Sequence, residues 1–170
     1  MNNCFILNNI RSVYNVGSFF RIADALGWDL IFQGYTPHPR VKNDTRLPYI
    51  IRKDEDQIKK TAVKTFSKIR WNYFNTTLEV LEFLKSHNYN LYSLEEGVNR
   101  AVNLFNFKQI KKPFALTLGN EVSGVEEDFL KKSIAVLNIP MCGTNNSLNV
   151  GVSAAVAAYN LHFSANGCVP

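Results

Sequence analysis

Two short apolar runs near the C-terminal end of the sequence most constrain its fold. These runs, Phe114 to Leu118 and Ile134 to Ile139, are rich in residues that favour strands, and each is followed by a loop of Gly, Asn, Ser and Thr. A helical pattern follows each loop. Strand, polar loop and helix, occurring twice, predict an α/β fold. Ligands of open α/β sheets bind beyond the carboxyl ends of the strands, so we expect a site at these two loops.

The helix after the second loop has few bulky side chains. Asn146 or Ser147 can cap its first turn, and small residues recur from Gly151 to Ala158. These small residues allow close approach to a neighbouring backbone. The residues alone leave two interpretations open, a buried core helix and a ligand-binding helix, and composition favours the core helix.

The same alternation of strands and helices runs through the rest of the chain. Short apolar runs predict strands at 4–7, 30–33, 71–74 and 91–94. Helical spacing predicts helices at 16–26, 56–66 and 126–132, and another that Thr76 or Thr77 caps and that ends near His87. In that last helix Leu78, Leu81 and Leu84 are expected to face inward. Three prolines make 36–48 a loop, whereas 95–109 fits a loop, a short helix or a strand. The prediction is an α/β fold with a mostly parallel sheet and helices on both faces.

Length and hydrophobicity bound the organisation and location of the protein. With 170 residues, of which 46% are hydrophobic, we expect one domain over residues 1–170. No apolar run is long enough to span a membrane, and the first residues lack the pattern of a secretory signal. We therefore expect a cytoplasmic protein.

Cysteine and histidine usage gives no support for metal binding or hydrolytic triads. Cys4, Cys142 and Cys168 have neither metal-ligand spacing nor the pairs of a disulfide framework, so we expect reduced thiols and no metal site. For Cys142 a small buried filler is the favoured interpretation. The three histidines are far apart in the sequence.

Positive charge is concentrated in one segment. The net charge is +5, and 35–75 holds ten Lys and Arg against four Asp and Glu, interleaved with aromatic residues. Such runs are often only a solvated surface, but cations with aromatics also suit an RNA-binding surface. The candidate RNA contacts are Arg40, Lys42, Arg46, Arg52 and Lys53.

Three stretches, in order, resemble the motifs of the SpoU-type (TrmH-like) RNA 2′-O-ribose methyltransferases of the SPOUT class. NIRSVYNVGSFFRIADALG begins at Asn9, GNEVSGV begins at Gly119, and NIPMCGTNNSLNVGVSAAV begins at Asn138. The resemblance covers nearly the whole chain. It implies a C-terminal trefoil knot, a homodimer with the active site near the subunit interface, S-adenosylmethionine as methyl donor, and tRNA or rRNA as substrate. Many relatives carry a separate RNA-binding extension, and we expect none here.

The resemblance also implies roles for residues that match the motifs. The catalytic candidates are Asn15, Arg21, Glu121, Ser147 and Asn149. The candidates for binding the donor are Gly119, Gly124, Ile139, Met141, Gly143, Ser147 and Leu148. Arg21 is expected to act on the ribose 2′-hydroxyl. Because a guanidinium is essentially never deprotonated, we favour Arg21 as the group that orients the hydroxyl, with an RNA phosphate or Glu121 as proton acceptor. The alternative is an Arg21 whose basicity the site strongly perturbs.

Two other functions are weighed against methyl transfer. One is a relative that binds RNA without catalysis, which the intact polar motif residues argue against. The other is a doubly wound enzyme that uses a nucleotide or dinucleotide. No G-x-G-x-x-G or Walker loop follows a predicted strand, so the sequence does not favour it.

Overall fold

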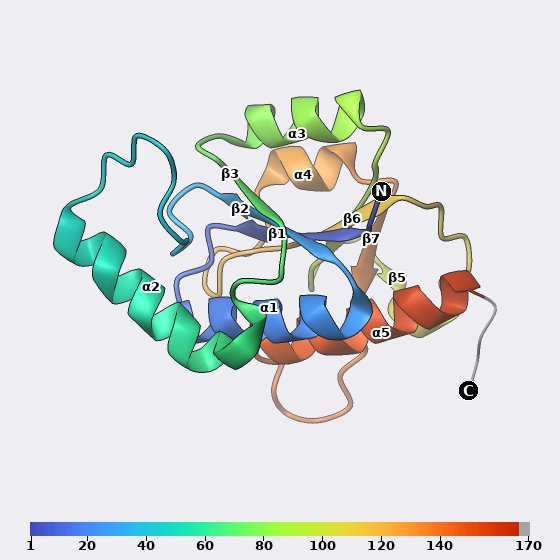
Figure 1. Ribbon diagram of the computed structural model, residues 1–170. Coiled ribbons are helices and arrows are strands. Elements are labelled where there is room, and N and C mark those ends of the chain that lie inside the picture. Colours follow the sequence, from blue (N-terminus) through green and yellow to red (C-terminus); the bar gives the residue numbers. More distant parts are fainter. Residues whose placement is uncertain (167–170) are drawn as a thin grey trace.

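The computed structural model describes residues 1–166, which form a seven-stranded sheet with helices on both faces (Figure 1). The strand order is β3-β2-β1-β6-β4-β7-β5, and every pair of neighbouring strands is parallel. The strands are β1 Cys4–Asn8, β2 Asp29–Gln33, β3 Trp71–Phe74, β4 Asn90–Leu94, β5 Val102–Asn103, β6 Phe114–Leu118 and β7 Ala135–Asn138. The helices are α1 Val13–Leu26, α2 Pro48–Ala62, α3 Thr77–Ser86, α4 Glu127–Lys132 and α5 Val150–Asn166, with short 3₁₀ turns η1 Val63–Thr65 and η2 Leu104–Asn106.

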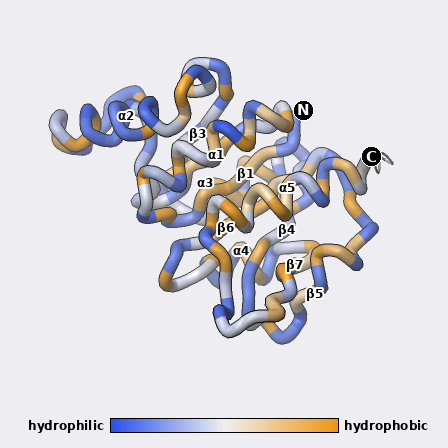
Figure 2. The backbone as a smooth tube through the Cα atoms, turned by 90° about the horizontal axis from the view of Figure 1, so that it is seen from below, coloured by the Kyte–Doolittle hydropathy of each residue, from blue (hydrophilic) through white to orange (hydrophobic). Residues whose placement is uncertain are grey.

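Side chains of the central strands alternate between two hydrophobic clusters. On β1, Phe5 and Leu7 belong to the cluster that includes residues of α1 and α5, whereas Cys4 and Ile6 belong to the cluster that includes residues of α3 and α4. Figure 1 shows these two pairs of helices on opposite faces of the sheet, with α2 packed outside α1. In Figure 2 hydrophobic stretches mark the central strands and α5. The predicted parallel sheet with helices on both faces is therefore confirmed.

Local signals explain where α1 lies. The Ser12 side chain caps α1 by accepting from the backbone N–H of Asn15, and Gly27 ends it with a φ of 65°. A Cβ at Gly17 would overlap the side chain of Thr61, so this glycine permits the close packing of α1 against α2.

Two helices differ from the sequence prediction. Helix α2 begins at Pro48, earlier than predicted, because proline suits the first turn of a helix. In α3 the predicted cap is Thr76, which forms a capping box with Glu79. The predicted inward face is wrong at Leu78, which is exposed, whereas Val80 is buried with Leu84.

The strand order brings the loops that follow β1, β6 and β4 to neighbouring positions at one edge of the sheet. After β1 the chain builds outward through β2 and β3, and it then forms β4, β6 and β7 on the other side of β1. The strands are parallel, so their carboxyl ends share one edge of the sheet. This reversal of direction is the position where α/β sheets bind ligands.

Candidate functional site

A cavity of about 490 Å³ lies at the carboxyl ends of β4, β6 and β7 and beside the start of α5. Its lining combines the buried apolar side chains of Leu94, Leu118 and Ile139 with polar residues of the loops that follow the strands. The lining residues include all of the predicted donor-binding residues except Gly143. They are Gly119, Gly124, Ile139, Met141, Ser147 and Leu148.

The loop after β6 is folded tightly on itself. The backbones of Asn120 and Gly124 exchange two hydrogen bonds of 3.0 Å, and Gly124 has a φ of 74°. A Cβ at Gly119 would overlap the backbone of Gly124. The Asn120 side chain accepts from the N–H groups of Val122, at 2.8 Å, and Ser123, at 2.9 Å. This geometry requires glycine at 119 and 124 and holds Glu121 between them at the cavity.

Glu121 joins this loop to the one that precedes α1. Its carboxylate accepts from the backbone N–H groups of Arg11, at 2.8 Å, and Ser12, at 3.1 Å, and from the Asn15 side chain at 2.8 Å. Partial burial acts to raise the pKa of the Glu121 carboxyl, but the hydrogen bonds, chiefly from Arg11 and Asn15, outweigh it and lower this pKa below its usual value. Glu121 is therefore an ionised hydrogen-bond acceptor at neutral pH and a poor proton acceptor.

Asn149 brings the start of α5 to the same cluster. Its side-chain oxygen accepts from the N–H of Gly151 at 2.9 Å, so Asn149 caps α5, and the prediction of Asn146 or Ser147 as the cap is wrong. The Asn149 amide also donates to the side-chain oxygen of Asn15 at 3.2 Å. Asn15, Glu121 and Asn149, predicted together from separate motifs, thus meet in space.

Behind this cluster, polar side chains fix the loop that follows β1. The Asn120 amide donates to the carbonyl of Asn9 at 2.8 Å, and the buried Asn8 accepts from the N–H of Glu126 at 2.8 Å. The Glu126 carboxylate in turn accepts from the side chains of Asn9 and Thr77. Motif loops that are over 100 residues apart in sequence are therefore held in register.

Arg21 and Gly143 lie outside the cavity lining. Arg21 is exposed on α1, and within residues 1–166 its side chain makes no hydrogen bond or ion pair. Gly143 sits in the loop 140–149, and a Cβ added to it would have no neighbour within 4 Å. Cys142 lies in the same loop and is exposed, so its interpretation as a buried filler is wrong. Cys168 lies outside the described residues.

Sequence reasoning missed the contribution of β4. Glu95 and Glu96 follow this strand and line the cavity. The Glu95 carboxylate accepts from the N–H of Val125 at 2.6 Å, and that of Glu96 accepts from the N–H of Ile139 at 3.1 Å. The signal that could have found them is their position at the carboxyl end of a predicted strand, next to two others that carry motifs.

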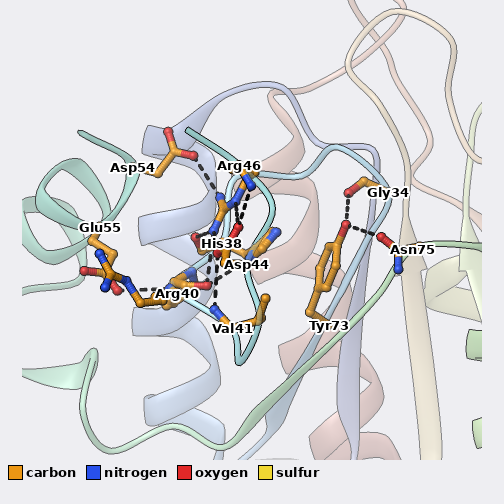
Figure 3. Close-up of polar contacts among 11 residues, drawn as sticks. Gly34, His38, Arg40, Val41, Asp44, Arg46, Asp54, Glu55, Tyr73 and Asn75 are labelled. Carbon is orange, nitrogen blue, oxygen red and sulfur yellow. Dashed lines mark hydrogen bonds and ion pairs between the residues drawn. The ribbon is translucent and has the colours of Figure 1, made fainter. Parts of the chain in front are cut away.

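The basic segment is largely exposed, with one exception. Arg40, Lys42, Arg52 and Lys53 are exposed, as an RNA contact requires. Arg46 is only partly exposed and pairs with Asp44, at 2.7 Å, and Asp54, at 3.1 Å (Figure 3). Its charge is thus neutralised within the chain.

Residues 1–166 offer neither a metal-binding cluster nor a membrane-spanning helix. No group of three or more His, Cys, Asp or Glu side chains there could hold a metal ion. No helix there is long and apolar enough to cross a membrane.

Comparisons with known proteins agree on one family. The model of the SpoU rRNA Methylase family matches residues 2–159. The chain is 25% identical to a tRNA (guanosine(18)-2′-O)-methyltransferase of Thermus thermophilus, over 91% of this chain and 71% of the relative. It is also 25% identical to the 23S rRNA (guanosine(2553)-2′-O)-methyltransferase RlmP of Bacillus subtilis, over 92% of this chain but only 56% of the relative.

Solved structures share the fold. The SpoU methyltransferase AviRb from Streptomyces viridochromogenes, in complex with AdoMet, aligns with a TM-score of 0.73 at 22% identity, over 98% of this chain and 62% of that one. A structure described as giving insights into the 2-OH methylation of C/U34 on tRNA aligns with a TM-score of 0.75 at 23% identity, over 97% of both chains.

Proposed function

The chain belongs to the SpoU rRNA methylase family, and from this premise we propose that it transfers a methyl group from S-adenosylmethionine to a ribose 2′-hydroxyl of tRNA or rRNA. The observation that carries the proposal is the meeting of Asn15, Glu121 and Asn149 beside a cavity of about 490 Å³. The names of the relatives in Thermus thermophilus and Bacillus subtilis support the same reaction class.

The residues of the cavity fit the proposed donor. Its volume lies within the range of about 300–1,000 Å³ that is typical of small-molecule sites. Leu94, Leu118 and Ile139 offer apolar contact for a purine, and backbone groups of the tight loops can hydrogen-bond to it. Carboxylates of Glu95 and Glu96 in the lining favour a cationic ligand. When bound, S-adenosylmethionine supplies an electrophilic methyl group on a positively charged sulfur.

Roles for the chain's own residues follow from the geometry. Glu121 holds the loop before α1 against the cavity and is unsuited to accept a proton, because its oxygens already accept three hydrogen bonds and its pKa is lowered. Arg21 orients the ribose hydroxyl and stabilises the negative charge that develops on its oxygen. Of the two proton acceptors expected from the sequence, Glu121 and an RNA phosphate, the proton then goes to the phosphate.

A homodimer would complete this site. Arg21 is exposed and lies outside the cavity lining of its own chain, so a second copy is the natural source of the missing cation. Apolar side chains are exposed on α1, on α5 and at the cavity loops, where they can form the interface. These residues are Tyr14, Val122, Leu148, Val152, Tyr159 and Phe163.

Further features of the proposal rest on family resemblance. The trefoil knot at the C-terminal end is one of them. Three other features rest on the sequence itself: a single catalytic domain over residues 1–170 on its length, action in the cytoplasm on its hydropathy and N-terminus, and contact of the exposed basic residues with RNA on its charge pattern. The chain spans only about half to seven-tenths of the length of the two named relatives, so the substrate is proposed as a class, tRNA or rRNA.

Transfer of labelled methyl groups tests the proposal. The protein is incubated with S-adenosylmethionine labelled in its methyl group and with total tRNA or rRNA, while calorimetry measures donor binding separately. Label in one RNA class is the expected result. Donor binding without label in either class would instead favour the relative that binds RNA without catalysis.

A further inference from the structure

A second hollow lies along β3, the edge strand on the side of the sheet away from the donor cavity. It has a volume of about 510 Å³ and is lined by the loop 38–46, by the first three residues of β3 and by Asn75. Cations, amides, aromatic rings and the Asp44 carboxylate share its lining, and Figure 3 shows part of it. Its lining includes Arg40, Lys42, Asn43, Trp71, Asn72 and Tyr73.

The loop 38–46 is held in one conformation by Arg46. Its guanidinium donates to both carboxylate oxygens of Asp44, at 3.0 and 2.7 Å, and to the carbonyl of His38 at 3.1 Å. The same group donates to Asp54 of α2 at 3.1 Å, which fastens the loop to that helix. The hydrogen bond and charge of Arg46 hold the pKa of the Asp44 carboxyl far below its usual range. Arg46 is therefore a positioning residue of this loop.

The floor of the hollow is a pair of stacked rings. His38 stacks on Tyr73 with ring centroids 3.9 Å apart, and burial lowers the pKa of His38, so its ring is neutral at pH 7. Two acceptors lie within reach of the single Tyr73 hydroxyl proton, the Gly34 carbonyl at 3.1 Å and the Asn75 side-chain oxygen at 3.0 Å. These contacts hold the Tyr73 side chain in one orientation on β3.

The groups left free at the hollow suit one nucleotide. Arg40 and Lys42 are exposed, and within the described residues their side chains form no ion pair, so they can neutralise phosphates. The exposed amides of Asn43 and Asn72 likewise make no hydrogen bond within residues 1–166 and can pair with base edges. Trp71 adds a half-buried aromatic ring. A base must be unpaired to enter such a hollow, so single-stranded RNA fits and a duplex does not.

We propose that this hollow is a second RNA subsite, which takes an unpaired nucleotide of the substrate away from the methylated ribose. This inference rests on the proposed function, because it presumes an RNA substrate. It goes further by assigning places within the hollow, with the base beside Trp71 and Asn72 and the phosphates at Arg40 and Lys42. It also excludes Arg46 from the RNA contacts that the sequence predicts.

Tryptophan fluorescence tests the subsite directly. The chain has two tryptophans, and Trp28 is buried in the core, whereas Trp71 lines the hollow. Titration with a single-stranded RNA oligonucleotide should quench the emission, and the Trp71→Phe variant should lose most of that quenching while its circular dichroism spectrum stays native. Unchanged quenching in Trp71→Phe would overturn the proposal.

A charge-matched pair of variants tests the phosphate contacts. Arg40→Ala with Lys42→Ala should weaken oligonucleotide binding roughly tenfold and reduce the slope of log K against log salt by about 1.4, or about 0.7 for each lost contact. Lys108→Ala with Lys111→Ala removes the same charge from exposed residues outside the hollow and should change neither quantity. Equal effects of both pairs would mean that only net charge matters, which contradicts the subsite.

The two proposals can fail separately, because fluorescence needs no turnover. Quenching through Trp71 without methyl transfer would support the subsite and count against the proposed reaction. Methyl transfer with an unchanged KM for RNA in the Arg40 and Lys42 variant would leave the reaction standing and overturn the subsite.

Discussion

The side-chain amide of Asn149 donates to the side-chain oxygen of Asn15 over 3.2 Å, so the first turn of α5 is tied to the first turn of α1. The same Asn149 oxygen caps α5. One residue thus ends the cavity loop, begins the last helix and orients a catalytic candidate.

Substitutions at Asn149 separate these tasks. Asn149→Ala loses the cap and should lower the free energy of unfolding by about 1 kcal/mol, measured by urea denaturation. Asn149→Asp keeps an oxygen that can cap the helix but loses the amide donor to Asn15, so stability should stay near that of the wild type while methyl transfer falls. Equal activity of Asn149→Asp and wild type would show that the contact with Asn15 has no catalytic role.

Glu121→Gln should have an effect on stability that depends on pH. The folded protein lowers the pKa of Glu121 below its usual 4.5, so its contribution to stability is fully present above pH 4.5 and is lost as pH falls through the lowered value. Glutamine presents an N–H group where a carboxylate oxygen accepts from Arg11 or Ser12. Urea denaturation should show a less stable variant at pH 7 and a difference that shrinks below pH 4.5. A difference that is constant from pH 7 to pH 3 would contradict this role for the carboxylate.

Substitution of Gly119 tests whether the tight loop after β6 is needed for stability and donor binding. In Gly119→Ala the new Cβ overlaps the backbone of Gly124, which should cost about 1–3 kcal/mol of stability. Displacement of the loop should also weaken donor binding, measured by calorimetry, by roughly tenfold, or about 1.4 kcal/mol. Gly143→Ala is the control, because its Cβ meets nothing within 4 Å. A donor affinity that falls as much in Gly143→Ala would place the donor elsewhere.

Arg46→Ala should destabilise the fold. It leaves the partly buried Asp44 and Asp54 without their shared cation, which should cost about 2 kcal/mol in thermal or urea unfolding. Arg52→Ala removes an exposed arginine from α2 and should change stability by no more than about 0.5 kcal/mol. If the two variants are equally stable, Arg46 does not position the loop.

The fold was predictable where local patterns coincide with burial. The strand Phe114–Leu118 was predicted with its observed bounds, because five consecutive buried residues give a strong signal. The start of α2 was not, since the charged and apolar residues after Pro48 give a weak pattern and the helix depends on packing against α1. Leu78 was assigned inward by spacing alone, whereas the buried face of α3 is formed by Thr77, Val80 and Leu84, and Leu78 is exposed.

The candidate site was predictable only as far as motifs reach. Glu121, Ser147 and Asn149 lie at the cavity as expected, because the resemblance names them. Glu95 and Glu96 were missed, since only the order of strands in the sheet brings them to the cavity. Likewise, Arg46 was predicted as an RNA contact because the charge pattern alone does not show which cations are paired. The folded loop places the carboxylates of Asp44 and Asp54 beside it.

The position of the methyl group in RNA tests the central claim most directly. The protein is incubated with labelled S-adenosylmethionine and total tRNA or rRNA, the RNA is digested to nucleosides, and mass spectrometry locates the label. Wild-type protein should place label on the ribose 2′-oxygen, and Arg21→Ala should give none while its donor affinity stays within a few-fold of wild type. Label on a base, or full activity in a folded Arg21→Ala, would contradict it.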